Sequence, residues 1–136
     1  MGNSGDLAPK KEIVRTVKAP VPVAPYSQAV RVGNLLFCSG QGPIDPQTGQ
    51  VVRGNTAEQA RVTLNNLKAV IEAGGSSMGN VVKVTVYLSN IEDFAAFNEV
   101  YREFFSGSDL PARTAVQVAR MWSDIAVEVE AIALVP

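Results

Sequence analysis

The residue types that could do chemistry in this sequence are restricted, because none of its 136 residues is a histidine. Without histidine there can be no Ser-His-Asp or Cys-His nucleophilic pair and no histidine metal site. Cys38 is the only cysteine, which excludes an intrachain disulfide and a cysteine-rich zinc site. No dense run of carboxylates forms a calcium-loop pattern, so we do not expect a metal. Any reaction must therefore use a carboxylate, an arginine, a lysine, a tyrosine or a backbone group.

Arg113 lies in a short connection immediately before a predicted strand. Its guanidinium presents a rigid, planar fork of donors, which suits a carboxylate better than a lysine would. Most arginines are exposed and form salt bridges without further function, and the sequence pattern alone favours that alternative. Arg113 is thus a candidate carboxylate-binding residue whose role depends on its surroundings.

Glu128 and Glu130 stand two apart in a predicted strand, so both side chains point to the same face. Burial beside a like charge would raise the pKa of one carboxyl group towards the range in which a general base works. A solvated acidic face is the alternative, and the spacing alone favours it.

Three further residues could line a site. Asn98 lies one residue beyond Phe97, at the edge of the predicted buried stripe of a helix, and its ordinary role would be a hydrogen bond on the helix surface. Tyr26 lies in a proline-rich bend, where it closes a pocket or anchors the loop by packing. Gly40 ends a strand and could expose backbone amides to an anion, or could be required only by a turn. Cys38 lies inside an apolar strand and is predicted to be a core residue.

The elements that must position these residues follow one another as ββ-β-α-β-α-ββ, which is a mixed α+β order. Residues 1–12 are polar and contain glycine, proline and lysine, so we expect a disordered tail before a single domain over 13–136. Strands are predicted over 13–17, 29–32, 35–39, 81–88, about 114–120 and 125–134.

Two helices are predicted between these strands. Thr56 and Gln59 fit a capping box that begins the first helix, and Gly74-Gly75 ends it. Asn90 can cap the second helix. The buried stripe of the second helix is expected to be aromatic, with Phe94, Phe97, Tyr101 and Phe105.

Alternation along the strands predicts which residues share a sheet face. The core face should carry Val82, Val84, Val86, Leu88, Thr114, Val116, Val118, Ile125, Val127 and Val129. The opposite face should carry Lys83, Thr85, Tyr87, Ala115, Gln117, Glu128 and Glu130. That second set is too polar for a dry core and suits a wet subunit interface, although a solvated sheet face fits the pattern equally well.

Composition narrows the class of protein. The net charge is −1 and no basic cluster extends beyond Lys10-Lys11, so we do not expect binding to nucleic acid or to a membrane surface. The N-terminal residues contain no apolar run of the kind a secretory signal needs, which favours a cytoplasmic protein, with an organelle as the alternative.

Six ordered blocks together resemble the RidA (YjgF) family: PYSQA (25–29), LLFCSGQ (35–41), a helix ending in EAGG, DFAAFNEVYREFF (93–105), PARTAVQVAR (111–120) and VEVEAIA (127–133). The resemblance covers about residues 17–136. It implies a chorismate-mutase-like α+β fold, with two helices on one face of a mixed sheet. It also implies a homotrimer with the sheets facing inward and active-site clefts between subunits.

The resemblance also implies an enamine/imine deaminase, which hydrolyses 2-imino acids to 2-keto acids and ammonia without a cofactor. Arg113 occupies the place of the arginine that holds the substrate carboxylate, and Glu128 that of the glutamate that activates water. Tyr26, Gly40 and Asn98 map to the surrounding cleft. Ala115 stands where many members have cysteine, and its backbone amide can still bind the carboxylate. The alternatives are an endoribonuclease or translation inhibitor, a keto-acid sensor without catalysis, or a chaperone.

Overall fold

The structure is a computed structural model that describes residues 8–136. Its elements are β1 (Lys11–Val14), β2 (Ala29–Val32), β3 (Leu35–Gln41), α2 (Thr56–Ala73), η1 (Met78–Asn80), β4 (Val81–Leu88), η2 (Ile91–Asp93), α3 (Phe94–Phe104), β5 (Ala112–Gln117), η3 (Trp122–Asp124) and β6 (Val127–Leu134). Residues 1–7 of the predicted tail lie outside the described residues. The first strand begins at Lys11, inside the range 1–12 assigned to that tail.

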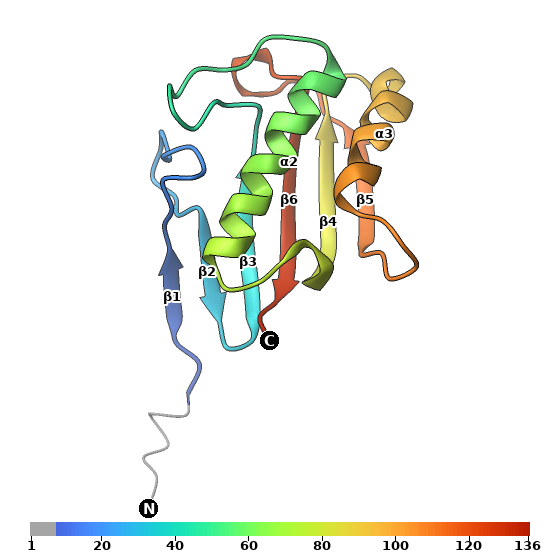
Figure 1. The fold of residues 1–136 in the computed structure, drawn as a ribbon. Helices are drawn as coiled ribbons and strands as arrows, with labels where there is room; N and C mark the ends of the chain where they lie inside the picture. The colour runs from blue at the N-terminus through green and yellow to red at the C-terminus, as the bar shows by residue number, and fades with distance from the viewer. Residues whose placement is uncertain (1–7) are drawn as a thin grey trace, which may run out of the picture.

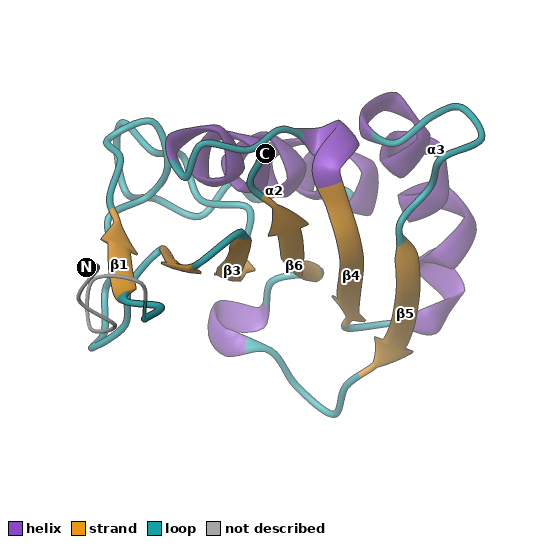
Figure 2. Ribbon diagram, turned by 90° about the horizontal axis from the view of Figure 1, so that it is seen from below, coloured by secondary structure: helices purple, strands orange, loops and turns teal. Residues whose placement is uncertain are grey.

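The six strands form one mixed sheet in the order β1-β2-β3-β6-β4-β5. Neighbouring strands are antiparallel, except that β4 and β5 run parallel and are joined by the crossover through α3. Both α-helices lie on one face of the sheet, next to each other (Figures 1 and 2). The predicted α+β fold, with two helices on one face of a mixed sheet, is confirmed.

The core lies between the helices and the sheet. Leu64, Leu67 and Ile71 recur at helical spacing along α2 and are fully buried. Burial of each side chain of this size stabilises the fold by about 1.5–3 kcal/mol. No helix within residues 8–136 is both long and apolar enough to cross a membrane.

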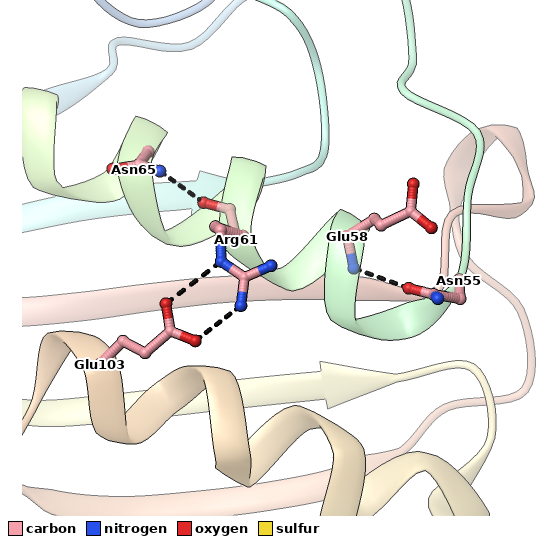
Figure 3. Close-up of polar contacts among 5 residues, drawn as sticks. All are labelled: Asn55, Glu58, Arg61, Asn65 and Glu103. Atoms are coloured by element: carbon pink, nitrogen blue, oxygen red, sulfur yellow. Dashed lines mark hydrogen bonds and ion pairs between the residues drawn. The ribbon is translucent and has the colours of Figure 1, made fainter.

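The start of α2 differs from the predicted capping box by one residue. Asn55, rather than Thr56, is the N-cap, and its Oδ1 accepts a hydrogen bond of 2.9 Å from the Glu58 amide (Figure 3). Gln59 is buried, and its Nε2 donates a 3.0 Å hydrogen bond to the carbonyl of Gly54, the residue before the cap. Its Oε1 accepts a 2.8 Å hydrogen bond from the Ala126 amide, which ties the helix start to the segment before β6.

An exposed ion pair joins the two helices on their solvent side. Arg61 of α2 donates to both carboxylate oxygens of Glu103 of α3, from Nε at 3.1 Å and from Nη2 at 2.6 Å (Figure 3). Hydrogen bonding to Arg61 lowers the pKa of Glu103. Because both side chains are solvated, the pair contributes little to stability.

Two apolar side chains predicted for the core are exposed. The register of β4 against β6 shifts between Val81 and Lys83, and this irregularity turns Val82 outward, leaving it 39% exposed. Phe94 is the first residue of α3 and is 40% exposed, because its ring lies beside the Arg113 guanidinium rather than in the core.

The face assignment of β5 was wrong. The strand starts two residues earlier than predicted, and Thr114 and Val116 are exposed on the face away from the helices. Arg113 and Ala115 lie opposite buried residues of β4, so both side chains point to the helix side. Gln117 also lies on the helix side, where its side chain accepts a hydrogen bond from η2.

The sheet face opposite the helices, here called the open face, carries both polar and apolar side chains. Its polar residues include Lys83, Thr85, Tyr87, Glu128 and Glu130, as predicted. Its exposed or half-buried apolar residues include Ile13, Phe37, Ile132 and Leu134. The loop that contains η3 crosses below this face in Figure 2.

Candidate active site

Arg113 reaches from β5 towards α3 on the helix side of the sheet. Its Nη1 donates a 2.8 Å hydrogen bond to Asn98 Oδ1, and its Cζ lies 4.7 Å from the centroid of the Tyr101 ring. A cleft of about 290 Å³ opens beside these three residues and is here called the arginine cleft. Within residues 8–136 no carboxylate lies within ion-pair distance of Arg113. The guanidinium is therefore held in place and keeps donors for an anionic ligand.

Tyr101 belongs to this cleft, although the sequence pattern placed it only in the core. It follows Asn98 by three residues, so both lie on one side of α3. Its hydroxyl is buried and has no hydrogen-bond partner within residues 8–136. Burial raises the pKa of Tyr101 to about 12, although the nearby Arg113 opposes the shift. The hydroxyl is thus protonated at neutral pH beside the guanidinium.

Glu128 projects from β6 on the open face and is half-buried. Its carboxylate lies directly over Gly40 of β3: a Cβ on residue 40 would be only 2.8 Å from Glu128 Cδ. A side chain at position 40 would therefore displace the Glu128 carboxylate. Burial, and secondarily the charge of Glu130, raise the pKa of Glu128. The predicted raised pKa thus falls on this glutamate.

Glu130 is engaged differently. Its carboxylate accepts a hydrogen bond from the Tyr87 hydroxyl, and this bond is the main cause that raises the pKa of Tyr87 to about 12. Glu128 has no such partner within the described chain, so its carboxylate remains available to a water molecule or a ligand. No group of three or more potential metal-binding side chains occurs among residues 8–136.

Glu128 lines a second cleft, of about 330 Å³, here called the glutamate cleft. Tyr26 and Gly40 line it as well, and Tyr26 is 47% exposed. Trp122 of η3 forms another wall, and nothing in the sequence pattern singled it out. The only signal was its type, since it is the one tryptophan of the chain and stands outside every apolar repeat.

The predicted site residues thus fall into two groups on opposite faces of the sheet. Arg113 lies opposite Val84, whose side chain is in the core on the helix side. Glu128 lies opposite Tyr87 on the open face. Because the sheet separates the two side chains, a small substrate bound in one subunit cannot contact both of them.

The candidate Ala115 and the predicted core residue Cys38 lie outside both clefts. Ala115 is half-buried against the core on β5, which is an edge strand with backbone groups directed outward. Cys38 is buried, and burial raises its pKa to about 12, so the thiol is protonated and unreactive at neutral pH. The prediction that Cys38 is a core residue is confirmed.

Comparison with known proteins agrees with this architecture. The family model described as Endoribonuclease L-PSP matches residues 16–135. A RutC family protein of Pyrococcus abyssi is 53% identical over 123 residues, which cover 90% of this chain and 96% of that protein. The mouse protein named 2-iminobutanoate/2-iminopropanoate deaminase is 45% identical over 124 residues, which cover 91% of each chain.

A solved structure shows the same fold. The crystal structure of Escherichia coli TdcF with bound serine superimposes with a TM-score of 0.85 at 43% identity, covering 91% of this chain and 98% of that one. The family match spans nearly the whole chain, and the solved relative has the same arrangement of helices and strands. The chain belongs to the RidA (YjgF) family, the family described as Endoribonuclease L-PSP.

Proposed function

We propose that this protein hydrolyses 2-imino acids to 2-keto acids and ammonia, in a homotrimer whose sites lie between subunits. The substrates are 2-aminoacrylate, 2-aminocrotonate and their imine tautomers, which pyridoxal-phosphate enzymes release from serine and threonine. One observation carries the proposal: a fixed guanidinium and a carboxylate of raised pKa each line a cleft of their own. The name of the mouse relative supports the same reaction.

The assembly follows from the separation of Arg113 and Glu128. A neighbouring subunit that covers the open face can bring its arginine cleft to the glutamate cleft and complete one site per interface. The exposed apolar side chains of Phe37 and Leu134 on that face, 43% and 42% exposed, favour burial against another copy. In a closed ring of such head-to-tail interfaces, each interface forms one site, so the proposed trimer has three sites.

The enzyme needs to supply only a modest rate acceleration, because these imines already hydrolyse in water. Arg113 of one subunit would orient the substrate carboxylate through two parallel hydrogen bonds. Glu128 of the next subunit would take a proton from water as the oxygen attacks C2 of the imine. The imine nitrogen receives that proton, which gives the neutral carbinolamine. A second transfer through Glu128, from the carbinolamine hydroxyl to the nitrogen, then breaks the C–N bond and releases ammonia and the keto acid.

The remaining site residues support these two groups. Asn98 positions the guanidinium through its 2.8 Å hydrogen bond. Gly40 makes room for the glutamate, and Tyr26 closes the glutamate cleft over the substrate. The backbone amide of Ala115 would assist Arg113 in holding the carboxylate. The reaction uses no metal and no cofactor, and we expect it to take place in the cytoplasm.

A coupled assay tests the proposal. A threonine dehydratase generates 2-iminobutanoate, semicarbazide traps the imine, and the purified protein competes with the trap. Deaminase activity predicts that semicarbazone formation falls as the protein concentration rises, while 2-oxobutanoate accumulates. An unchanged rate of semicarbazone formation at every protein concentration contradicts it.

The other functions predict different results. An endoribonuclease would bind RNA with an affinity that falls steeply with salt, and the chain carries a net charge of −1. A keto-acid sensor would bind 2-oxobutanoate without accelerating imine loss. A chaperone would suppress aggregation of unfolded proteins with no dependence on Arg113.

A further inference from the structure

We propose that Trp122 determines which imino-acid side chains the site accepts, and that it favours large apolar side chains over a methyl group. This inference rests on the proposed deaminase function. Trp122 is 57% exposed in the single chain and lines the glutamate cleft together with Glu128. A large apolar side chain exposed at the wall of a cleft is a surface that a ligand can cover.

The loop that carries Trp122 is held in one conformation. Ser123 and Asp124 have φ values of 55° and 52°, in the left-handed region that residues other than glycine rarely adopt. Arg53 stabilises this conformation from another part of the chain. Its Nη1 donates to the Ser123 carbonyl at 2.6 Å, and its Nη2 donates to Ser123 Oγ at 2.9 Å.

Residues on both sides of Trp122 anchor the same loop. Met121 and Ile125 are buried, with exposed fractions of 9% and 2%. The Asp124 amide donates to the Met121 carbonyl at 3.0 Å, which closes the turn. The indole is therefore presented on a fixed support, as a residue that selects ligands by shape must be.

The substrate geometry assigns this wall to the side chain of the imino acid. C2 of the substrate carries three groups, namely the carboxylate, the imine nitrogen and the side chain. In the proposed site Arg113 of the neighbouring subunit holds the carboxylate, and Glu128 directs water to C2. Trp122 is the largest of the apolar residues that line the rest of the cleft, which include Val21 and Val23. A cleft of about 330 Å³ has room for more than a methyl or ethyl group.

Kinetics with two imines test the assignment. An L-amino acid oxidase generates 4-methyl-2-iminopentanoate from leucine and 2-iminopropanoate from alanine, and semicarbazide traps each. For Trp122→Ala we expect the ratio of kcat/KM for the larger over the smaller imine to fall about tenfold or more, mainly through KM. Trp122→Phe should retain most of the preference. Val17→Ala, at an exposed apolar residue outside the glutamate cleft, is the control and should leave the ratio unchanged.

Intrinsic fluorescence gives a second readout that does not require turnover. Trp122 is the only tryptophan, so its emission reports directly on the cleft. We expect saturable emission changes with 4-methyl-2-oxopentanoate at lower concentrations than with pyruvate. If the wild type hydrolyses neither imine but shows this selective response, the deaminase function fails and Trp122 still selects the ligand. An unchanged kinetic ratio in Trp122→Ala, or an altered oligomeric state with unchanged selectivity, overturns the inference.

Discussion

Replacement of Arg113 by lysine tests the carboxylate-binding role while keeping the positive charge. In the structure the guanidinium donates from Nη1 to Asn98 Oδ1 at 2.8 Å and lies 4.7 Å from the Tyr101 ring centroid. The ammonium group of a lysine cannot keep this contact and also present two parallel donors to a substrate.

The expected magnitude follows from the lost contact. A hydrogen bond to a charged group contributes about 1.5–3 kcal/mol, so Arg113→Lys should lower kcat/KM by about 10- to 150-fold. The assay is the semicarbazide competition with 2-iminobutanoate, on protein shown by circular dichroism and size exclusion to have the wild-type fold and assembly.

Arg61→Lys is the matched control. Arg61 also makes a two-point contact with a partner, Glu103, but it lies on the helix surface outside both clefts. We expect its kcat/KM to equal that of the wild type. If Arg113→Lys also stays within about twofold of the wild type, the planar fork is not used and the reasoning for this site is wrong.

Three further substitutions test Glu128 and Gly40 of the glutamate cleft and Cys38 of the core. Glu128→Gln should lower kcat, while 2-oxobutanoate should bind with near-normal affinity. In the wild type, kcat/KM should fall at acid pH, with a midpoint above the ordinary carboxyl pKa of 4.5, and this fall should be absent in Glu128→Gln. Because burial raises the pKa of Glu128, ionisation of its carboxyl group destabilises the folded wild type. The stability of Glu128→Gln relative to the wild type should therefore increase as the pH rises through that pKa. A Tm difference between the two proteins that stays constant between about pH 4 and pH 7 would contradict this. Gly40→Ala should displace the Glu128 carboxylate and lower kcat about tenfold to a hundredfold, whereas wild-type turnover would show that the close approach is irrelevant. Cys38→Ser should lower the free energy of unfolding by about 1–3 kcal/mol, because it buries a hydroxyl group. The variant should keep most of the activity in the imine assay. Loss of turnover in a folded variant would assign the thiol a catalytic role.

Most of the fold could be predicted because periodicity reports burial directly. The α2 helix, the hairpin at Gly33 and the strand over 81–88 follow from repeats of apolar residues and from turn residues. The face of β5 could not be predicted from alternation. It is an edge strand whose exposed Val116 has the residue type of a core position, while Arg113 occupies the helix side.

The candidate site was predicted residue by residue but not in its arrangement. Arg113 and Glu128 were expected on the basis of family resemblance, yet only the register of the sheet shows that they lie on opposite faces. Contacts between distant segments carry no local signal, which is why the Arg53 support of Ser123 could not be foreseen. The role of glycine at position 40 likewise depends on a glutamate on another strand.

The central claim is that each site combines Arg113 of one subunit with Glu128 of another, and mixed trimers test it most directly. Arg113→Lys and Glu128→Gln are co-expressed with different affinity tags, and the doubly tagged assemblies are compared with each parent variant. Every doubly tagged trimer contains both variants, so about one third of its interfaces join an intact arginine to an intact glutamate. We predict that the doubly tagged assemblies recover up to about one third of the wild-type kcat/KM, well above both parents. Mixed assemblies no more active than the average of the two parents would contradict the shared site.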